Sequence, residues 1–313
     1  MKPGRLFKSL TLTLVMAAIP MQFAAAAEQP KVALVMKSLA NEFFRTMEDG
    51  AKAHQKQHAS QYTLVANGIK DETDTANQIR IVEQMIVEHA NAIVLAPADS
   101  KALVPVVKKA VDAGILVVNI DNRLDPATLK SKGLNVPFVG PDNRKGARLV
   151  GDYLAKQLKA GDKVGILEGV STTTNAQQRT AGFQDAMKAK GATVVGVQSG
   201  DWEIDKGNTV ASAMLREHPD MKALLCGNDN MALGAVAAIK TAGMAGKVKV
   251  VGYDNIAAIK PMLADGRVLG TVDQYAAKQA VFGIELALKA LKNKTPQSAL
   301  PAVYETPITL VTR

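Results

Sequence analysis

The sequence is poor in cysteine, in aromatic residues and, beyond its first 27 residues, in long apolar runs. A single cysteine among 313 residues cannot form an intrachain disulfide, and it excludes a cysteine-rich zinc or iron–sulfur site. No stretch after residue 27 approaches the roughly 18 consecutive apolar residues of a membrane-spanning helix. The composition is 47% hydrophobic and 21% charged, which is typical of a globular protein and excludes disordered and collagen-like chains. The length suffices for about two domains, each with its own core.

The first 27 residues have the order of a bacterial secretory signal. Three basic residues lie within the first eight positions, residues 10–19 are apolar, and alanines at 25–27 precede Glu28. No cysteine stands at the expected cleavage point, so a lipid anchor is not indicated. We therefore expect residues 1–27 to be a cleaved signal peptide and the mature protein to be located in the periplasm. The removal takes away three positive charges and lowers the net charge from +9 to +6.

The positive charge raises the question of a nucleic-acid or membrane partner. The lysines, however, are scattered along the expected helices beside acidic residues, and no dense basic run with interleaved aromatic residues occurs. We therefore interpret the charge as that of a solvated surface and expect no nucleic-acid partner.

Short apolar runs alternate with amphipathic segments along the chain. The pattern predicts strands at residues 32–36, 62–66, 92–95, 116–120, 164–167, 193–197, 223–226 and 248–253. It predicts helices at residues 43–57, 74–88, 102–113, 176–190, 206–217 and 231–241. Continuous Val, Ile and Leu strands that alternate with helices are typical of a parallel sheet covered by helices, so the expected fold class is α/β.

Residues 92–121 and 223–254 resemble each other. Each segment is an expected strand, a polar turn with an aspartate, a helix closed by Ala-Gly, and a second strand that ends in Asp121 or Asp254. The agreement favours two similar α/β lobes. Ligands of open parallel sheets bind beyond the carboxyl ends of the strands, so two facing lobes would bring Asp121, Asn228 and Asp254 into one cleft.

No set of catalytic residues is evident. His54 and His58 have the spacing of metal ligands on a helix, but the Gln-Lys-Gln between them lacks a glutamate, and an exposed helix face is the simpler interpretation. Cys226 lies in an apolar strand and is expected to be a buried small hydrophobe rather than a nucleophile. Nucleotide-binding glycine motifs and the serine-hydrolase elbow are lacking as well. We therefore expect no catalysis, no metal and no cofactor.

Three of the few aromatic residues lie near expected strand ends. Phe43 and Phe44 follow the first strand, and Trp202 is the only tryptophan. Each alone is more typical of a core residue. Together with polar groups at strand ends, however, flat apolar faces suit a small ligand with many hydroxyl groups.

Several longer motifs carry a more specific resemblance. They are VALVMKSLANEFF at 32–44, APADSKAL at 96–103, VVNIDNR at 117–123, NAQQRTAGF at 175–183, GNDNMALGA at 227–235 and VVGYDN at 250–255. With these motifs the chain resembles the type I periplasmic sugar-binding proteins, close to the ribose-binding members, over essentially its whole mature length. The resemblance implies two doubly wound parallel-sheet lobes joined by a three-segment hinge. It places residues 28–141 and 275–306 in the N-terminal lobe, and residues 142–274 and 307–313 in the C-terminal lobe.

The resemblance also implies which residues contact the ligand. Matched by position, they are Asn41, Phe43, Phe44 and Asp121 from the first lobe, and Arg179, Trp202, Asn228, Asp254 and Gln274 from the second lobe and the hinge. Aspartate and asparagine oxygens accept hydrogen bonds from sugar hydroxyls, while arginine and the amides donate to them.

The first-lobe half of the expected site departs from the ribose-binding pattern. Lys37 stands where those proteins carry a serine, Ala96 replaces an asparagine, and Glu42 replaces a proline. Asn122 intervenes between Asp121 and the following arginine. We include Lys37 and Asn122 among the expected contacts, although Lys37 could be either a ligand donor or a charge at the cleft rim. The departures predict a ligand other than ribose, with ribose bound weakly or not at all.

The implied function is capture of a small neutral monosaccharide or polyol and its delivery to the permease of an ABC transporter. Closure of two lobes by hinge motion would accompany binding. We expect a monomer, and a chemoreceptor is a further partner compatible with this function. Two alternatives remain open: a secreted carbohydrate-processing enzyme, and a binding protein that serves mainly a chemoreceptor. A repressor with the same core would carry a helix-turn-helix where this chain carries its leader.

Overall fold

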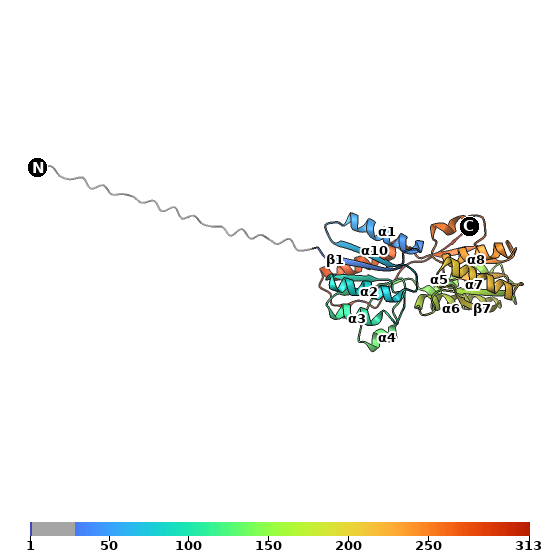
Figure 1. Cartoon of the computed structure of the whole chain (residues 1–313), viewed down its shortest axis with the longest axis horizontal. Helices are drawn as coiled ribbons and strands as arrows, with labels where there is room; N and C mark the ends of the chain where they lie inside the picture. Colours follow the sequence, from blue (N-terminus) through green and yellow to red (C-terminus); the bar gives the residue numbers. More distant parts are fainter. Residues whose placement is uncertain (2–28) are drawn as a thin grey trace.

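The computed structural model describes Met1 and residues 29–313, so the predicted signal peptide lies outside the described residues. Two α/β lobes lie side by side, and the chain passes between them more than once (Figure 1). No helix of the described part is long and apolar enough to cross a membrane.

The first lobe is built on a sheet of six parallel strands. Their spatial order is β11-β5-β4-β3-β1-β2. The strands are β1 (Lys31–Ser38), β2 (Thr63–Ile69), β3 (Ala92–Leu95), β4 (Leu116–Ile120), β5 (Phe138–Gly140) and β11 (Val303–Glu305). The helices are α1 (Glu42–Gln57), α2 (Thr75–Val87), α3 (Val104–Asp112), α4 (Pro126–Ser131) and α10 (Ala276–Lys292), with a 3-10 turn η2 (Gln297–Ala299).

Both faces of this sheet are covered, which explains why its central strands consist mainly of apolar residues. In β1, Val32, Leu34 and Met36 pack with α1 and α10, while Ala33 and Val35 pack with α2 and α3. Successive side chains of a strand point to opposite faces, so a strand buried on both sides cannot alternate between apolar and polar residues.

The second lobe repeats the plan with one difference. Its sheet has the order β12-β10-β9-β8-β6-β7, and only the edge strand β12 is antiparallel to its neighbour. The strands are β6 (Lys163–Glu168), β7 (Thr193–Ser199), β8 (Ala223–Cys226), β9 (Lys249–Val251), β10 (Gly270–Asp273) and β12 (Thr309–Thr312). The helices are α5 (Asn143–Ala155), α6 (Thr174–Lys190), α7 (Ile204–Glu217), α8 (Asp229–Thr241) and α9 (Lys260–Ala264), preceded by the 3-10 turn η1 (Ala257–Ile259).

The predicted fold class is confirmed, and so is the internal repeat. Residues 92–121 form β3, α3 and β4, and residues 223–254 form β8, α8 and β9; these strands occupy equivalent places in the two sheet orders. The chain passes from one sheet to the other after β5, after β10 and after β11. These passages contain the predicted lobe limits, which themselves stay a prediction.

Candidate ligand-binding site

A cavity of about 220 Å³ lies between the two lobes. Its lining consists of Lys37, Asn41, Phe43, Phe44, Asp121, Asn175, Arg179, Trp202, Asn228, Asp254 and Gln274. The structure thus brings together ten of the eleven residues named from the sequence and adds Asn175; their contact with a ligand stays a prediction. The cavity is small, so it suits one small ring rather than two linked rings.

Three lining residues have left-handed or strained backbone conformations. Asp121 follows β4 with φ +60°, Asp254 follows β9 with φ +114°, and Trp202 has φ +68°. Such conformations are costly for residues with a side chain and gather at binding sites, where the surrounding structure holds them. The turns after β4 and β9 therefore aim the two predicted carboxylates at the cavity.

A buried carboxyl outside the cavity lining fixes the turn that carries Asp254. Thr271 Oγ1 donates to Asp229 Oδ1 at 2.8 Å, and the backbone N–H of Ile256 donates to Asp229 Oδ2 at 3.0 Å. Burial raises the pKa of Asp229 well above its usual range. The sequence identified Asp229 as the turn aspartate of the internal repeat and as part of the GNDNMALGA motif, but not as a residue that supports the site.

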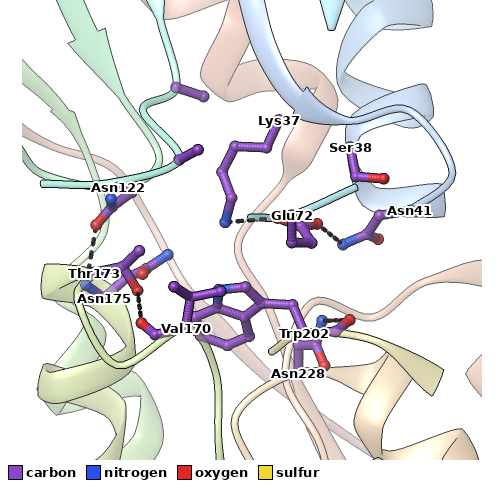
Figure 2. A network of polar contacts seen from close by, with 12 residues as sticks. Lys37, Ser38, Asn41, Glu72, Asn122, Val170, Thr173, Asn175, Trp202 and Asn228 are labelled. Atoms are coloured by element: carbon purple, nitrogen blue, oxygen red, sulfur yellow. Dashed lines mark hydrogen bonds and ion pairs between the residues drawn. The ribbon is translucent and has the colours of Figure 1, made fainter. Parts of the chain in front are cut away.

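The first-lobe wall contains an ion pair. Lys37 Nζ lies 3.0 Å from Glu72 Oε2, and Asn41 Nδ2 donates to Glu72 Oε1 at 2.9 Å (Figure 2). Lys37 is only 2% exposed, so it is not a charge at the cleft rim. Burial raises the pKa of the Glu72 carboxyl, with Lys37 acting in the opposite direction. Glu72 does not line the cavity, and sequence reasoning missed it.

The second-lobe wall is organised by Arg179. Its Nε donates to Asn143 Oδ1 at 2.8 Å, its Nη1 donates to the Gly227 carbonyl at 2.9 Å, and Nη1 lies 3.5 Å from Asp254 Oδ1. The guanidinium also stacks on Tyr253, 3.7 Å from the ring centroid. These contacts hold the charged fork of Arg179 rigidly at the cavity, where charge-assisted hydrogen bonds are strong.

Asp254 is held from two sides. In addition to Arg179, Gln274 Nε2 donates to its Oδ1 at 2.6 Å. Burial raises the pKa of Asp254 to about 7, against the lowering effect of Arg179, while the nearby Asp121 raises it further. Burial likewise raises the pKa of Asp121.

The aromatic residues close the cavity from both lobes. The ammonium of Lys37 lies 5.2 Å from the centroid of the Trp202 ring and 5.3 Å from that of Phe44, so it sits near a ring of each lobe. Asn228 holds the backbone of Trp202 through a 3.1 Å hydrogen bond from its Nδ2 to the Trp202 carbonyl, while its Oδ1 accepts from Met231 N at the start of α8. Much of the hydrogen-bonding capacity of Asn228 is therefore used inside the protein.

Two lining groups have no hydrogen-bond partner among the described residues. They are Trp202 Nε1, a donor, and Asp121 Oδ2, an acceptor, and both are buried. Buried polar atoms are normally paired, so unpaired ones at a cavity indicate where a ligand would bind. A hydroxyl-bearing ligand supplies both kinds of partner.

Asn122 is placed away from the cavity. Its Nδ2 donates to the Pro97 carbonyl at 2.9 Å, and its Oδ1 accepts from Asn175 N of the second lobe at 3.2 Å (Figure 2). The strained backbone at Asp121 turns the chain, so the next side chain points elsewhere. Asn122 joins the lobes instead of lining the pocket.

First-lobe oxygens cap second-lobe helices. Ser100 Oγ accepts from Thr174 N at 2.9 Å, and the Glu42 carboxylate accepts from Ala257 N at 2.6 Å and Ala258 N at 3.2 Å. The corresponding helices α6 and η1 have no side-chain cap of their own. Because the first N–H groups of a helix need acceptors, these contacts stabilise the arrangement with the lobes together.

We expect Glu42→Ala to weaken ligand binding without any change in the cavity. The variant loses two cross-lobe hydrogen bonds, and because Glu42 is partly exposed we expect roughly a 3- to 10-fold rise in Kd, mainly through faster dissociation. Calorimetry and stopped-flow dissociation measure this effect. Glu48→Ala, on the same helix and paired only with Lys52, is the control. Equal Kd values for both variants would contradict the capping role.

We expect the ligand-free protein to open as pH rises. In the open form Asp254 is hydrated and should have a pKa near the usual value of about 3.9, whereas with the lobes together it is about 7. Protonation therefore favours the closed form, and this contribution is lost as pH rises through 7. Burial acts on Asp121 and Glu72 in the same direction. Small-angle scattering should show a larger radius of gyration at pH 9 than at pH 5, with a smaller difference in Asp254→Asn; a pH-independent radius would refute this.

The histidines and the cysteine considered for chemistry have structural surroundings in the described part of the chain. No group of three or more His, Cys, Asp or Glu side chains there could hold a metal ion. His54 is not on an exposed face as predicted: it stacks on His58 at 4.3 Å and its Nδ1 is 2.9 Å from the Tyr62 hydroxyl, and burial lowers its pKa. Cys226 is fully buried in β8, as predicted, and burial raises the pKa of its thiol.

Comparison with known sequences agrees with this geometry. A family model described as a periplasmic binding protein domain matches residues 32–295. The chain is 70% identical over 310 residues to a D-ribose/D-allose-binding protein of Pseudomonas aeruginosa, with 98% of this chain and 97% of the relative covered.

Solved structures show the same architecture. A solute-binding protein of an ABC transporter from Burkholderia multivorans is 79% identical, with a TM-score of 0.90 over 91% of this chain and 100% of that one; its unknown ligand was interpreted as α-D-erythrofuranose. A periplasmic solute-binding protein of an ABC transporter from Actinobacillus succinogenes, with bound D-allose, is 35% identical, with a TM-score of 0.84 over 91% of this chain and 98% of that one.

Proposed function

Because the chain belongs to the periplasmic binding protein family, as a sugar-binding member of type I, we propose that its ligand is an aldose with the hydroxyl configuration that D-allose and D-ribose share. The protein captures a monosaccharide or polyol between its lobes in the periplasm and delivers it to the permease of an ABC transporter. D-Allose and D-ribose have the same configuration at C2, C3 and C4, and D-allose carries an additional hydroxymethyl group on the pyranose ring. The related proteins that bind them support this ligand class.

The observation that carries the proposal is the pair of unpartnered buried groups at the cavity, Asp121 Oδ2 and Trp202 Nε1. The first lobe offers an acceptor and the second a donor. A ligand with hydroxyl groups directed at both lobes can donate to the one and accept from the other. A ligand bonded to both lobes favours their closed arrangement. The small cavity favours a ligand of one ring.

Within this class we propose that D-allose binds more tightly than D-ribose. Lys37 and Trp202 place two donors at the cavity from opposite lobes, and the resemblance assigns a serine and a smaller aromatic residue to these places in ribose binders. A lysine ammonium has three N–H groups where a serine hydroxyl has one O–H, and the larger number of donors suits a sugar with one more oxygen. A site built to hydrogen-bond a hydroxyl discriminates strongly against a ligand that lacks it.

Calorimetry and thermal shift on the mature protein test the ligand class. We expect the order D-allose, then D-ribose, then D-glucose, because D-glucose differs from D-allose only at C3. A ligand at 100 times its Kd raises the free energy of unfolding by about 2.7 kcal/mol, which a melting curve detects. Tighter binding of D-ribose would overturn the preference, and equal binding of D-glucose or of a disaccharide would overturn the ligand class.

We further propose that the ligand leaves the site unchanged and that the mature protein begins at Glu28 and is monomeric. The same closed form is suited to recognition by a permease and by a chemoreceptor ectodomain. Mass spectrometry of protein purified from the periplasm tests the cleavage site. Recovery of an altered sugar after incubation would instead support the alternative of a carbohydrate-processing enzyme.

A further inference from the structure

Glu72 is a buried charge that lies behind the cavity wall. It occurs between β2 and α2, is 1% exposed, and is not among the lining residues. Both of its oxygens are directed at side chains that do line the cavity, with Oε2 3.0 Å from Lys37 Nζ and Oε1 accepting from Asn41 Nδ2 (Figure 2). Burying a carboxylate costs free energy that pairing offsets only in part, so the presence of Glu72 at this place indicates a role toward these two lining residues.

The contacts of Glu72 fix the orientation of Lys37. A lysine side chain has a flexible four-carbon stem and a strongly hydrated ammonium. Inside a closed cavity the ammonium therefore needs partners that replace water and fix its position. The Glu72 carboxylate holds the ammonium at one side, and the rings of Phe44 and Trp202 lie 5.3 and 5.2 Å away. The ion pair with Glu72 holds the ammonium in place, and its N–H groups can donate to a ligand.

Glu72 also sets the charge of the cavity wall. Two cations, Lys37 and Arg179, face three carboxyl groups, Glu72, Asp121 and Asp254, and every one of these residues is at least nine-tenths buried. Lys37 is matched by Glu72, and Arg179 is matched by Asp254. No positive charge is left to compensate an anionic ligand, although Lys37 by itself would attract one.

We propose that Glu72 is a positioning residue that makes Lys37 a donor to neutral sugars and excludes sugar acids of the same skeleton. The inference rests on the proposed function, because it concerns the ligand class of the same site. It predicts that Glu72→Gln bound to a monoanionic sugar has the same total charge as the unchanged protein bound to the neutral sugar. Ligand selection should therefore shift toward the acid.

The test compares D-allose with D-alluronate, the C6 acid that keeps the pyranose ring. Calorimetry at one pH on the wild-type protein and on Glu72→Gln gives the ratio of the two Kd values. We expect this ratio, alluronate over allose, to fall by about tenfold or more in Glu72→Gln, in line with the size of buried charge effects. A structural defect alone would weaken both ligands equally and leave the ratio unchanged, which would overturn the inference. Glu83→Gln, on the exposed face of α2, is the control.

A second comparison covers the case in which Glu72→Gln is unstable. Lys37→Met leaves the Glu72 carboxylate buried without its cation, and the double variant Lys37→Met/Glu72→Gln removes that charge. We expect the double variant to melt at a higher temperature and to bind D-allose more tightly than Lys37→Met. A double variant worse than Lys37→Met in both respects would overturn the inference. Failure of the wild-type protein to bind any neutral sugar would refute the proposed function instead, so the two failures are distinguishable.

Discussion

Arg179→Ala should reduce ligand affinity more than any other single truncation in the second lobe, by roughly 2–5 kcal/mol. Arg179 is 3% exposed and joins Asn143, Gly227 and Asp254 through its guanidinium. Its removal leaves Asp254 without its cation in a closed cavity, where an unpaired charge is costly. Arg179 lowers the pKa of Asp254 against the effect of burial, so without it the group would be protonated more readily and the ligand would lose a charged acceptor together with the arginine donor.

Calorimetry on Arg179→Ala and Arg179→Lys separates charge from geometry. Lysine restores the positive charge but not the planar fork that reaches Asn143 and Gly227 together, so we expect it to recover only part of the affinity. Arg144→Ala, which breaks an exposed ion pair with Asp185, is the control and should bind normally. Wild-type affinity in Arg179→Ala would remove this residue from the site.

The sequence predicted the fold and part of the cavity lining because both depend on local regularities. Parallel strands buried on two faces are recognisable as continuous apolar runs, and the residue after such a strand lies at the carboxyl edge of the sheet. Asp121 and Asp254 follow from this rule, and the internal repeat places them in equivalent turns. Asn228 follows from the same rule, and Phe43, Phe44 and Trp202 stood out as rare aromatic residues near expected strand ends. The remaining lining residues that were predicted were named by resemblance to a family.

The errors arise where a side chain depends on a distant partner or on a special backbone angle. Asn122 was grouped with Asp121 because they are adjacent, but the positive φ at Asp121 separates their directions. No sequence pattern pointed to Glu72, because it lies in a loop 35 residues from Lys37. Its role depends on the ion pair with that distant residue, which only the structure shows. For the same reason the two roles considered for Lys37 could not be separated without the structure. The start of α8 was placed two residues late because the cap formed by Asn228 was not recognised.

A substitution at Gly169 should have the second large effect on ligand affinity, because the indole of Trp202 lies directly against its Cα. A Cβ at this position would overlap the six-membered part of the ring, so the indole would have to shift. The backbone of Trp202 is already in a left-handed conformation and is tied to Asn228. Trp202 lines the cavity, so a shift of its ring would change the space and the donor that a ligand meets.

We therefore expect Gly169→Ala to lower ligand affinity by roughly 1–3 kcal/mol, up to about a hundredfold in Kd, with a modest loss of thermal stability. Gly196→Ala is a matched control in the same lobe, because a Cβ there would meet only the end of the flexible Met214 side chain at 3.4 Å. Trp202 is the sole tryptophan, so its fluorescence reports on the ring itself. The emission of Gly169→Ala without ligand should differ from that of wild type, and its change on adding sugar should be reduced. Unaltered emission together with wild-type affinity would show that the indole accommodates the added methyl group. The contact between Gly169 and Trp202 would then not determine the shape of the cavity.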